Sequence, residues 1–526
     1  MTNKAQYGKI IFGLKVHQLR ESKNFSFSEL SDITGISISY LNEIEKGKKY
    51  PKPDKVILLA DALCISADAL ESPELPKNLQ PLEELLRSNF LNELPLDLFG
   101  IELFKVVEMI ASAPARVGAF IYTLVELSRN YALGEQNFYF AALRSYLELN
   151  NNYFEDLENA ATKFISDNNM PVCGNMPEQL LAALLKEKFG YHIVENGLDA
   201  YPALENIRAF FIKEKQKLLL NSRLTDAQRA FQFGKELGFN VLGLKERAYT
   251  ASLLKVNNFD EVLNHFKAGY FSAALLMPRD SFCEDIAAFF QTEKWDEGTF
   301  FKKLILKYNA TPEMLFQRMT NVLPKVFGLE KLFFLRILHP TSSNKFEINK
   351  ELHLSGKHHP QSSSMNEHYC HRWISIGILT DGELRIFDDS KEEISSKINE
   401  QAEKNLPFTN MRFGIQRSIY HKTGEDYICF SVAKSFGNID SSVTIGILLD
   451  DKAREKIKLL NDVSIPSRIV SNTCERCDMT DCRERQAPPR IVQRREQRRE
   501  INEALESITN YELLKRKTNK ASFNNH

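Results

Sequence analysis

The sequence predicts a mainly α-helical, multidomain protein that ends in a mixed α/β domain. At 526 residues the chain is several times the size of one domain, so several folding units share it. Apolar residues recur at helical spacing, beginning within the first seventy residues. Short β-rich runs separated by turn residues lie between residues 320 and 460, which predicts a sheet towards the C-terminus.

The composition excludes several classes of protein. Hydrophobic residues make up 43% and charged residues 26% of the chain, and the net charge of -1 gives no overall attraction to polyanions. No run approaches the ~20 apolar residues of a membrane span, and the first residues lack the order of a secretory signal. We therefore expect a cytoplasmic protein without membrane contact, whose eight cysteines are thiols or metal ligands.

The first seventy residues have the pattern of a four-helix bundle. Ser26 opens the second helix, and Gly35 supplies a tight turn after it. The predicted core residues are Phe12, Val16, Leu19, Leu30, Ile33, Val56, Leu59, Ala60 and Leu63. This compact core would hold the helix between the turn and residue 50 at the surface.

The third helix, which begins at Ser37, has one apolar and one polar face. Leu41 and Ile44 point inward and leave short polar side chains outside. Asn pairs with adenine edges, Ser with several bases, and a Tyr ring can lie against a thymine methyl. Lysines around the following glycine suit phosphates, which fix register without reading sequence. The predicted DNA contacts are Ser28, Ser37, Ser39, Tyr40, Asn42, Glu43, Lys46, Lys48 and Lys49.

The string from Ser31 to Lys48 resembles the helix-turn-helix of the Cro/repressor (XRE) family. The resemblance implies an N-terminal helix-turn-helix bundle that binds double-stranded DNA, and a homodimer that reads two half-sites. The chain departs from the family at Phe27, where the second helix usually begins with a phosphate-binding Gln. A helical bundle without a DNA role is the alternative interpretation.

The middle of the chain is predicted to be helical, with a long aromatic stripe over residues 138–154. Such a stripe usually belongs to a core. Arg116 and Arg144 lie near these aromatic residues in the sequence, and an apolar cavity with fixed cations would suit an acyl chain that carries phosphates. The alternative to packing is therefore a ligand site that uses these two arginines.

Residues 218–278 resemble the ImmA/IrrE metallopeptidase family. The resemblance is carried by Gln228–Phe239 and by the run Tyr270–Pro278, but the zinc helix motif His-Glu-x-x-His is replaced by Lys235 to Phe239. Neither an ammonium nor a benzyl ring donates a lone pair to zinc, and His265 stands near the expected third-ligand position. The segment is thus a degenerate zincin-like one, and we expect no enzyme activity; residual peptidase activity is the alternative.

Three cysteines lie within nine residues, at Cys474, Cys477 and Cys482. This spacing lets a turn direct thiolates at one metal, and a tetrahedral zinc or a [4Fe–4S] cluster needs a fourth ligand. Cys370 is the leading candidate. His368 or His371 would favour structural zinc instead, and free surface thiols are the alternative to any metal site.

Four β-rich runs define the mixed α/β unit, and we predict strands at Lys331–Leu338, Trp373–Leu379, Tyr427–Val432 and Val443–Leu449. The order of these elements is similar to that of small-molecule sensor domains, which is an analogy of fold alone.

The XRE-type reader, the degenerate peptidase segment, the lone Cys370 and the Cys-x2-Cys-x4-Cys ending together resemble the short-chain fatty acyl regulator family. That resemblance implies that Cys370, Cys474, Cys477 and Cys482 form one iron–sulfur site, and that an acyl-CoA is the effector. Members have Cys-Pro-x-Trp where this chain has His371 after the cysteine. The implied function is transcriptional regulation of short-chain fatty acid or acyl-CoA metabolism, with metabolite or iron–sulfur-linked sensing.

The alternative function is an ImmA/IrrE-like stress or phage-immunity regulator with a residual peptidase or protein-contact role.

From Arg490 to Arg499 the chain carries five arginines and continues as a charged helix, which is solvated or contacts phosphates or a second copy. The predicted parts are a helix-turn-helix domain at 1–72, a helical domain at 81–220, a degenerate ImmA/IrrE-like domain at 221–318, a mixed α/β sensor domain with the cysteines at 319–490, and a basic tail helix at 491–526.

Overall fold

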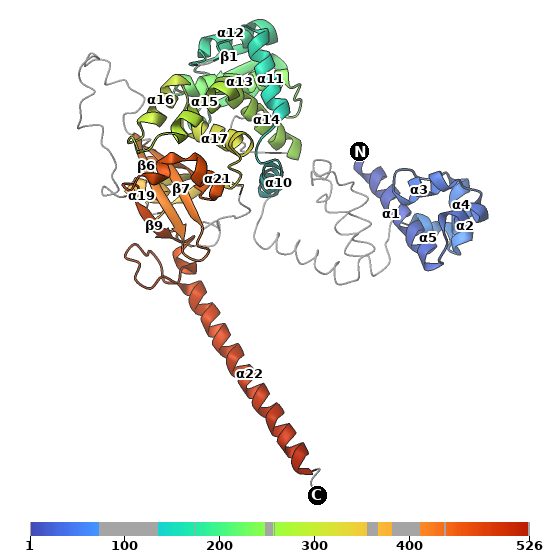
Figure 1. Cartoon of the computed structure of the whole chain (residues 1–526). Coiled ribbons are helices and arrows are strands. Elements are labelled where there is room, and N and C mark those ends of the chain that lie inside the picture. The colour runs from blue at the N-terminus through green and yellow to red at the C-terminus, as the bar shows by residue number, and fades with distance from the viewer. Residues whose placement is uncertain are drawn as a thin grey trace, which may run out of the picture. The chain divides into compact units, whose positions relative to one another are not determined.

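The computed structural model divides the chain into two compact units (Figure 1). Unit 1 comprises Met1–Tyr146 and Leu253–Leu263, and unit 2 comprises Leu147–Ser252 and Asn264–His526. The structure describes residues 2–72, 135–172, 174–247, 256, 258–343, 345–354, 367–380, 411–435 and 438–523. Arg116 lies outside the described residues.

Five helices form the N-terminal bundle of unit 1. Ser26 caps the second helix in a capping box with Glu29, and Gly35 ends it with a left-handed φ of 66°. Ser37 then caps the third helix through the amide of Tyr40. The helices are α1 (Thr2–Ser22), α2 (Phe27–Thr34), α3 (Ile38–Glu45), α4 (Pro53–Leu63) and α5 (Ala67–Glu71).

The core of this bundle confirms the predicted apolar positions with one exception. Ile33 is 55% exposed, so its placement in the core is wrong. The inward face of α2 runs from Leu30 to Thr34, which are four residues apart and both buried. Ile36, just after the turn, occupies the interior instead. A helix of only eight residues has room for one inward turn, and Ile33 lies to the side of it.

A buried ion pair connects α1 to α3. The Arg20 guanidinium donates to both carboxylate oxygens of Glu45, at 2.6 and 3.0 Å, and the Glu45 side chain is buried. Nδ1 of His17 lies 2.8 Å from the same carboxylate. Because Glu45 is the last residue of α3, this cluster fixes the end of the helix predicted to contact bases.

Unit 2 begins with helices that surround a small sheet. The helical prediction for residues 81–220 misses this sheet, whose strand order is β1-β3-β2. Its strands are three or four residues long, too short to show an alternation of apolar and polar residues. The elements of this region are α10 (Glu135–Leu149), α11 (Glu155–Asp167), α12 (Glu178–Phe189), β1 (His192–Val194), β2 (Ala209–Ile212), β3 (Lys217–Leu220), α13 (Asp226–Val241) and α14 (Phe259–Leu276). Most of α10 and the first residues of α14 belong to unit 1.

A second buried ion pair joins three helices of this unit. Arg318, which is fully buried, donates to both oxygens of Glu158 at 2.5 and 2.9 Å. The hydroxyl of Tyr270 donates to the same carboxylate at 2.7 Å. Both charges are paired and hydrogen-bonded. The contact between α11, α14 and the helix that carries Arg318 is therefore specific and not only apolar.

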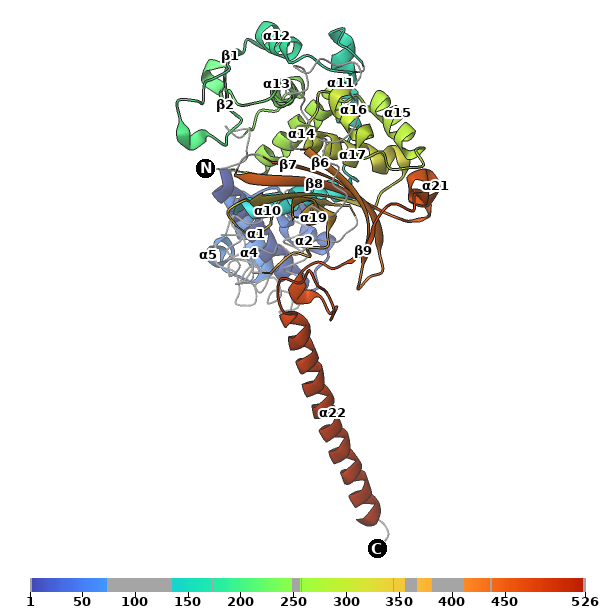
Figure 2. The same ribbon diagram turned by 90° about the vertical axis from the view of Figure 1, so that its left-hand side faces the viewer.

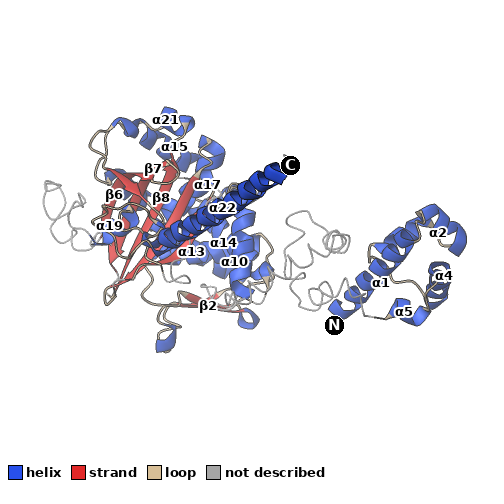
Figure 3. Ribbon diagram, turned by 90° about the horizontal axis from the view of Figure 1, so that it is seen from below, coloured by secondary structure: helices blue, strands red, loops and turns tan. Residues whose placement is uncertain are grey.

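The C-terminal part of unit 2 is a six-stranded sheet of order β5-β4-β8-β7-β6-β9, antiparallel except for the parallel β6–β9 pair. Figure 3 shows it as a single layer among helices. Its strands are β4 (Leu332–Pro340), β5 (Glu347–His353), β6 (Met411–Tyr420), β7 (Asp426–Ser435), β8 (Ile439–Leu448) and β9 (Ser467–Val470). The predicted strands at 331–338, 427–432 and 443–449 are confirmed.

Helices cover both faces of this sheet (Figure 2). Side chains alternate along β7, so Phe430 and Cys429 point to opposite faces. Phe430 packs against Phe289 and Phe301, whereas Cys429 belongs to the cluster around α19 (Ile374–Thr380). The helices on the Phe430 side are α15 (Arg279–Phe290), α16 (Thr299–Lys307) and α17 (Pro312–Phe327).

The strand prediction for 373–379 is wrong, because these residues form α19. Every residue from Ile374 to Leu379 is buried, so the run has no polar face that would reveal its period. A short apolar run of this kind is compatible with either structure, and its β-branched residues favoured a strand. Contact with β6, β7 and β8 on one side and burial on the others allow the helix.

The chain ends with short elements and one long helix. They are α21 (Asp451–Lys456), a 3-10 turn η5 (Lys458–Asn461), a 3-10 turn η6 (Cys474–Arg476) and α22 (Arg490–Phe523). The tail helix starts one residue before its predicted position. Among the described residues, no helix combines the length and the apolar character that a bilayer crossing requires.

The His17 site predicts a pH effect on unit 1. The hydrogen bond to Glu45 raises the pKa of His17 above its usual 6.5. A raised folded-state pKa stabilises the fold fully below the unfolded pKa, and this stabilisation is lost as pH rises through the folded value. The protection factors of α1 and α3 amides in hydrogen exchange should therefore fall as pH rises above about 6.5 and through the raised pKa of His17. His17→Gln should remove the pH dependence and His192→Gln, an exposed ring of unit 2, should keep it; equal slopes in all three proteins would contradict this account.

Candidate functional site

The helix α3 presents the predicted base-contacting residues at the surface of unit 1. The exposed members of the predicted set are Ser28, Ser37, Ser39, Lys46, Lys48 and Lys49, and the half-buried ones are Tyr40, Asn42 and Glu43. Leu41 and Ile44 anchor the other face of the helix in the core. The hydroxyl oxygen of Ser37 already accepts the Tyr40 amide, so Ser37 serves first as a cap.

Two lysines surround the ring of Tyr40. Lys49 lies 5.6 Å and Lys55 lies 5.9 Å from the ring centroid. Lys49 also pairs with Glu43 at 2.9 Å. Glu43 is therefore neutralised by a neighbour from the turn, and Lys55, which sequence reasoning missed, joins the same surface. Its signal was its place in the first turn of α4, close to the lysine turn.

Phe27 accounts for the departure from the XRE pattern. Its ring packs partly against the bundle core, and the Arg20 guanidinium lies 4.4 Å from the ring centroid. The position that carries a polar residue in the family thus supports the cation of the Arg20–Glu45 pair. The side chain has a packing role and offers no hydrogen bond to a phosphate.

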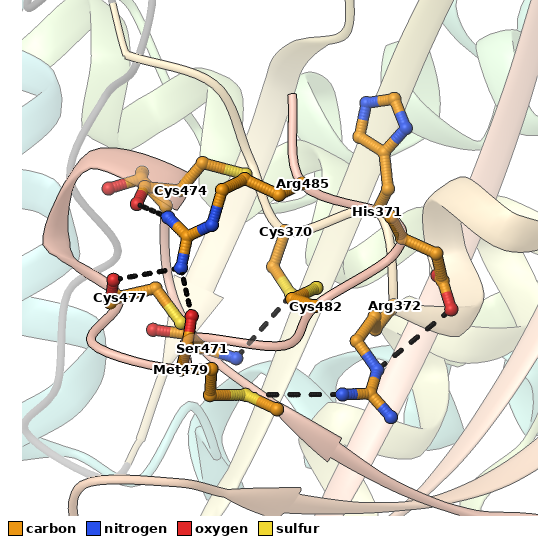
Figure 4. Close-up of a pocket in the computed structure, with 11 residues that line it drawn as sticks. Cys370, His371, Arg372, Ser471, Cys474, Cys477, Met479, Cys482 and Arg485 are labelled. Atoms are coloured by element: carbon orange, nitrogen blue, oxygen red, sulfur yellow. Dashed lines mark hydrogen bonds and ion pairs between the residues drawn. The ribbon is translucent and has the colours of Figure 1, made fainter. Parts of the chain in front are cut away.

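The structure brings the four predicted cysteines to one pocket of unit 2. Cys370 comes from the segment before α19, and Cys474, Cys477 and Cys482 come from the loop between β9 and α22 (Figure 4). We call this the thiol pocket. Its other lining residues are His371, Arg372, Ser471, Thr473, Met479, Glu484 and Arg485.

Reciprocal carboxylate contacts hold the two cysteine-bearing segments together. Glu367, before Cys370, accepts from Arg476 at 2.8 Å through both of its oxygens. Glu475, inside the Cys-x2-Cys turn and 1% exposed, lies 2.9 Å from Nδ1 of His368 and accepts its amide at 2.9 Å. Each segment therefore supplies a carboxylate to the other, across 107 and 109 residues of chain.

Backbone contacts complete this pairing. The Cys474 amide donates to the His368 carbonyl at 2.8 Å, and the Cys370 amide donates to the Asn472 carbonyl at 3.1 Å. The indole of Trp373 donates to Ser471 at 2.8 Å. These hydrogen bonds join the two segments whose thiols line one pocket.

Two sulfurs accept backbone hydrogen bonds. The Ser471 amide donates to Sγ of Cys370 at 3.5 Å, and the Gln486 amide donates to Sγ of Cys474 at 3.4 Å. Burial raises the pKa of Cys370 to about 11 and also raises the pKa of Cys474. Buried thiolates thus need compensating charge, which a bound cation and amide donors supply.

The guanidinium of Arg485 binds backbone carbonyls of the cysteine loop. It donates to the carbonyls of Cys474 at 2.9 Å, Cys477 at 3.2 Å and also Met479 (Figure 4). On the opposite wall, Arg372 lies 3.9 Å from the sulfur of Met479 and 3.9 Å from Glu484. The loop conformation therefore depends on Arg485, the arginine that follows the third cysteine as Cys-x-x-Arg in the sequence.

The donor set fits a thiolate-bound metal centre. Four sulfurs match the ligand number of zinc or a [4Fe–4S] cluster. His371 also lines the pocket, whereas Nδ1 of His368 is engaged by Glu475, which makes His371 the better histidine alternative. In the described part of the chain, no three His, Cys, Asp or Glu side chains lie in metal-ligand geometry. Binding of a metal would therefore require the thiol side chains to rearrange.

The peptidase-like core of unit 2 lacks a complete set of zinc ligands. Lys235 is buried, and its Nζ lies 2.9 Å from Nε2 of His265. Burial lowers the pKa of Lys235 to about 7 and holds that of His265 well below its usual value. Phe239 offers no lone pair to a metal, and His265 is engaged by Lys235, so this arrangement disfavours zinc.

The former general base is equally engaged. Glu236, which is 1% exposed, accepts from Arg247 at 2.9 and 2.8 Å and from the Tyr191 hydroxyl at 3.0 Å. The Arg247 guanidinium lies between the rings of Phe211 and Phe239, at 3.9 and 4.2 Å. A carboxylate in this environment is a structural ion pair.

The remaining predicted ligand residue is Arg144. It lies in α10 and is half-buried. Tyr139 and Ala142 of the same helix are buried, as the packing interpretation of the aromatic stripe predicts. A role of Arg144 in ligand binding stays a prediction.

Comparisons with known proteins agree with both domains. Residues 16–70 match a helix-turn-helix family model, and residues 186–320 match the model of the IrrE N-terminal-like domain, a span that includes β1, β2 and β3. The uncharacterized HTH-type transcriptional regulator YazB of Bacillus subtilis is 38% identical over 64 residues, 12% of this chain and 93% of that protein. The chain belongs to the helix-turn-helix family of transcriptional regulators and is a DNA-binding regulator.

A solved structure is also similar. It is a Mycobacterium tuberculosis transcriptional regulator, with a TM-score of 0.44 and 18% identity, covering 66% of this chain and 92% of that chain. At this identity and superposition the likeness carries no functional argument. The IrrE-like domain is a degenerate peptidase-like domain, given the residues at 235–239.

The engaged core predicts no zinc at the peptidase position. Glu236→Gln and His265→Ala should leave the zinc content of the purified chain equal to that of the unchanged protein. Glu236→Gln should also destabilise unit 2 by about 3–5 kcal/mol, because Arg247 loses its charge partner. Metal analysis and urea unfolding followed by tryptophan fluorescence measure the two effects. Stoichiometric zinc that disappears in either variant would instead restore the peptidase interpretation.

Proposed function

We propose that this DNA-binding regulator reads a specific operator as a homodimer through α3, and that a [4Fe–4S] cluster in the thiol pocket makes its activity responsive to metabolic state. The observation that carries the sensing proposal is the convergence of four thiols from two distant segments that reciprocal carboxylate contacts hold together. Free surface thiols would not need a shared buried wall.

The cysteines Cys370, Cys474, Cys477 and Cys482 would hold the cluster. The cluster would supply reversible one-electron chemistry and sensitivity to oxidants. The chain's own residues shape the site: amides of Ser471 and Gln486 donate to sulfur, and Arg485 fixes the loop carbonyls. Structural zinc, with His371 or the four thiols as ligands, is the alternative occupant.

The proposed metabolic role is more specific than regulation through DNA binding. Regulation of short-chain fatty acid or acyl-CoA metabolism, with an acyl-CoA effector, is supported by the resemblance of the reader, the degenerate peptidase domain and the cysteine pattern taken together. Arg144 is the described residue proposed for the ligand.

A second candidate function is regulation by protein contact. The IrrE-like domain favours this function. Its fold is present, although its internal contacts leave no role for a catalytic metal. A domain kept without its chemistry is a scaffold that a partner protein can recognise. The chain would then act as a stress or phage-immunity regulator, and binding of a protein in place of an acyl-CoA separates the two functions.

The DNA-reading prediction is tested at Tyr40 and Asn42. Changing both to Ala should weaken binding to selected sites by about 1–3 kcal/mol per lost base contact and leave binding to random duplex unchanged. Asp61→Ala, on an exposed position of α4, is the matched control. Unchanged affinity and salt slope in a folded double variant would refute base reading by α3.

The thiol pocket is tested by anaerobic purification with an optical spectrum and iron, sulfide and zinc analysis. We expect about four irons and four sulfides per chain and a broad visible band. Cys370→Ser should lower both contents, whereas Cys283→Ser, a thiol outside the pocket, should not. Zinc alone would identify a structural site, and a chain with neither metal would remove the cluster from the proposal.

A further inference from the structure

The tail helix α22 leaves the body of unit 2 immediately after the thiol pocket. It has 34 residues, which corresponds to a length of about 50 Å. Its start packs on η6, and Glu475 lies 3.5 Å from Arg490. From Gln493 to Thr509 every residue is exposed, as the isolated helix in Figure 2 shows. Among the described residues of unit 2, none covers this surface, and its length needs a physical explanation.

An apolar stripe runs along the middle of the exposed part. Ile501, Leu505 and Ile508 are spaced by four and three residues, so they lie on one face of the helix. Their exposed fractions are 59%, 57% and 62%. Three large aliphatic side chains in line at this spacing form the seam by which helices pair.

The charges of the helix are segregated along its length. Residues 490–499, the basic half of the segment 490–509, hold five arginines and one glutamate, and residues 500–509, its acidic half, hold three glutamates and neither lysine nor arginine. The helix then continues to Phe523 with one glutamate and four cations. The basic half contains arginines four residues apart, which destabilise an isolated helix: Arg490–Arg494, Arg494–Arg498 and Arg495–Arg499. Within the described residues of this segment, Arg499 pairs with Glu503 at 3.4 Å. The basic half thus calls for negative charge from outside the helix.

We propose that α22 pairs in antiparallel orientation with α22 of a second copy, centred between residues 499 and 500. This arrangement sets each basic half against the acidic half of the other copy. Leu505 then lies opposite Arg494, and Ile508 opposite Ile491. The methylene stems of the arginines cover the aliphatic stripe, while their guanidinium groups reach the glutamates beside it.

Other partners fit less well. A parallel, in-register pair would set the arginines of one copy against those of the other, which costs free energy. A nucleic acid would favour the basic residues at 490–499 and 515–520 but would be repelled by the acidic half at 500–509 that separates them. A second copy satisfies both halves and the apolar stripe at once.

The inference deepens the proposed function, since it rests on the homodimer proposed there and assigns it a surface. The overlap of 490–509 from both copies is about 30 Å long. Each thiol pocket lies at the start of its own helix, so the pairing places the two pockets at opposite ends of this overlap. A change of the cysteine loop would then act directly on the dimer contact.

Sedimentation equilibrium of the full chain, without DNA, tests the pairing. The unchanged protein should be dimeric at micromolar concentration, and Leu505→Lys should raise the dimer Kd by at least about tenfold, because it places a cation in the seam opposite Arg494 of the second copy. Ser507→Lys adds the same charge away from the seam and should change the Kd little. A monomeric unchanged protein, or equal Kd values for the two variants, would overturn the proposal.

Charge exchange tests the orientation. Arg494→Glu and Glu506→Arg should each weaken the dimer, and the combined variant should recover most of the affinity, because positions 494 and 506 of different copies lie close in the antiparallel register. A combined variant weaker than either single variant would overturn that register. DNA binding, measured in parallel, separates the two proposals. Variants with altered DNA affinity but an unchanged dimer mass would assign the arginines to phosphate contacts and overturn the pairing. A normal dimer without sequence preference would refute only the reading of base pairs.

Discussion

The thiol pocket depends on reciprocal carboxylate contacts between the two cysteine-bearing segments. Glu367 binds the segment that contains Arg476, and Glu475 binds the segment that contains His368. Because both acids are buried and hydrogen-bonded, loss of either would leave charges without partners. The backbone bonds around Cys370 and Cys474 then follow, and the four sulfurs meet although they are far apart in the chain.

The same principle organises the rest of the molecule. Arg20 and Glu45 fix the end of α3 in unit 1, and Arg318 and Glu158 connect three helices in unit 2. In the peptidase-like core, Arg247 pairs with the buried carboxylate of Glu236. Buried ion pairs contribute specificity of arrangement more than net stability, which suits a protein built from several positioned parts.

Coupling between the pocket and the tail helix has a direct physical route. Arg485 binds the carbonyls of the cysteine loop, and Glu475 contacts both His368 and the first residue of α22. Any ligand that reorganises the thiols must therefore alter contacts at the start of this helix. Coupling of this kind requires only that the two arrangements of the loop differ in their contacts with α22.

Local patterns in the sequence determined those elements whose signals lie within a few residues, because caps, turn residues and alternation act over that range. These elements are the capped helices at Ser26 and Ser37, the turn at Gly35, and three of the four predicted strands. The Cys-x2-Cys-x4-Cys spacing and the missing zinc ligands at 235–239 were also visible there. Tertiary structure alone decided that 374–380 is a helix, that Ile33 is exposed, that Phe27 supports Arg20, and that Cys370 meets the other thiols. These outcomes depend on which distant surfaces cover a residue, and a single sequence carries no record of that contact.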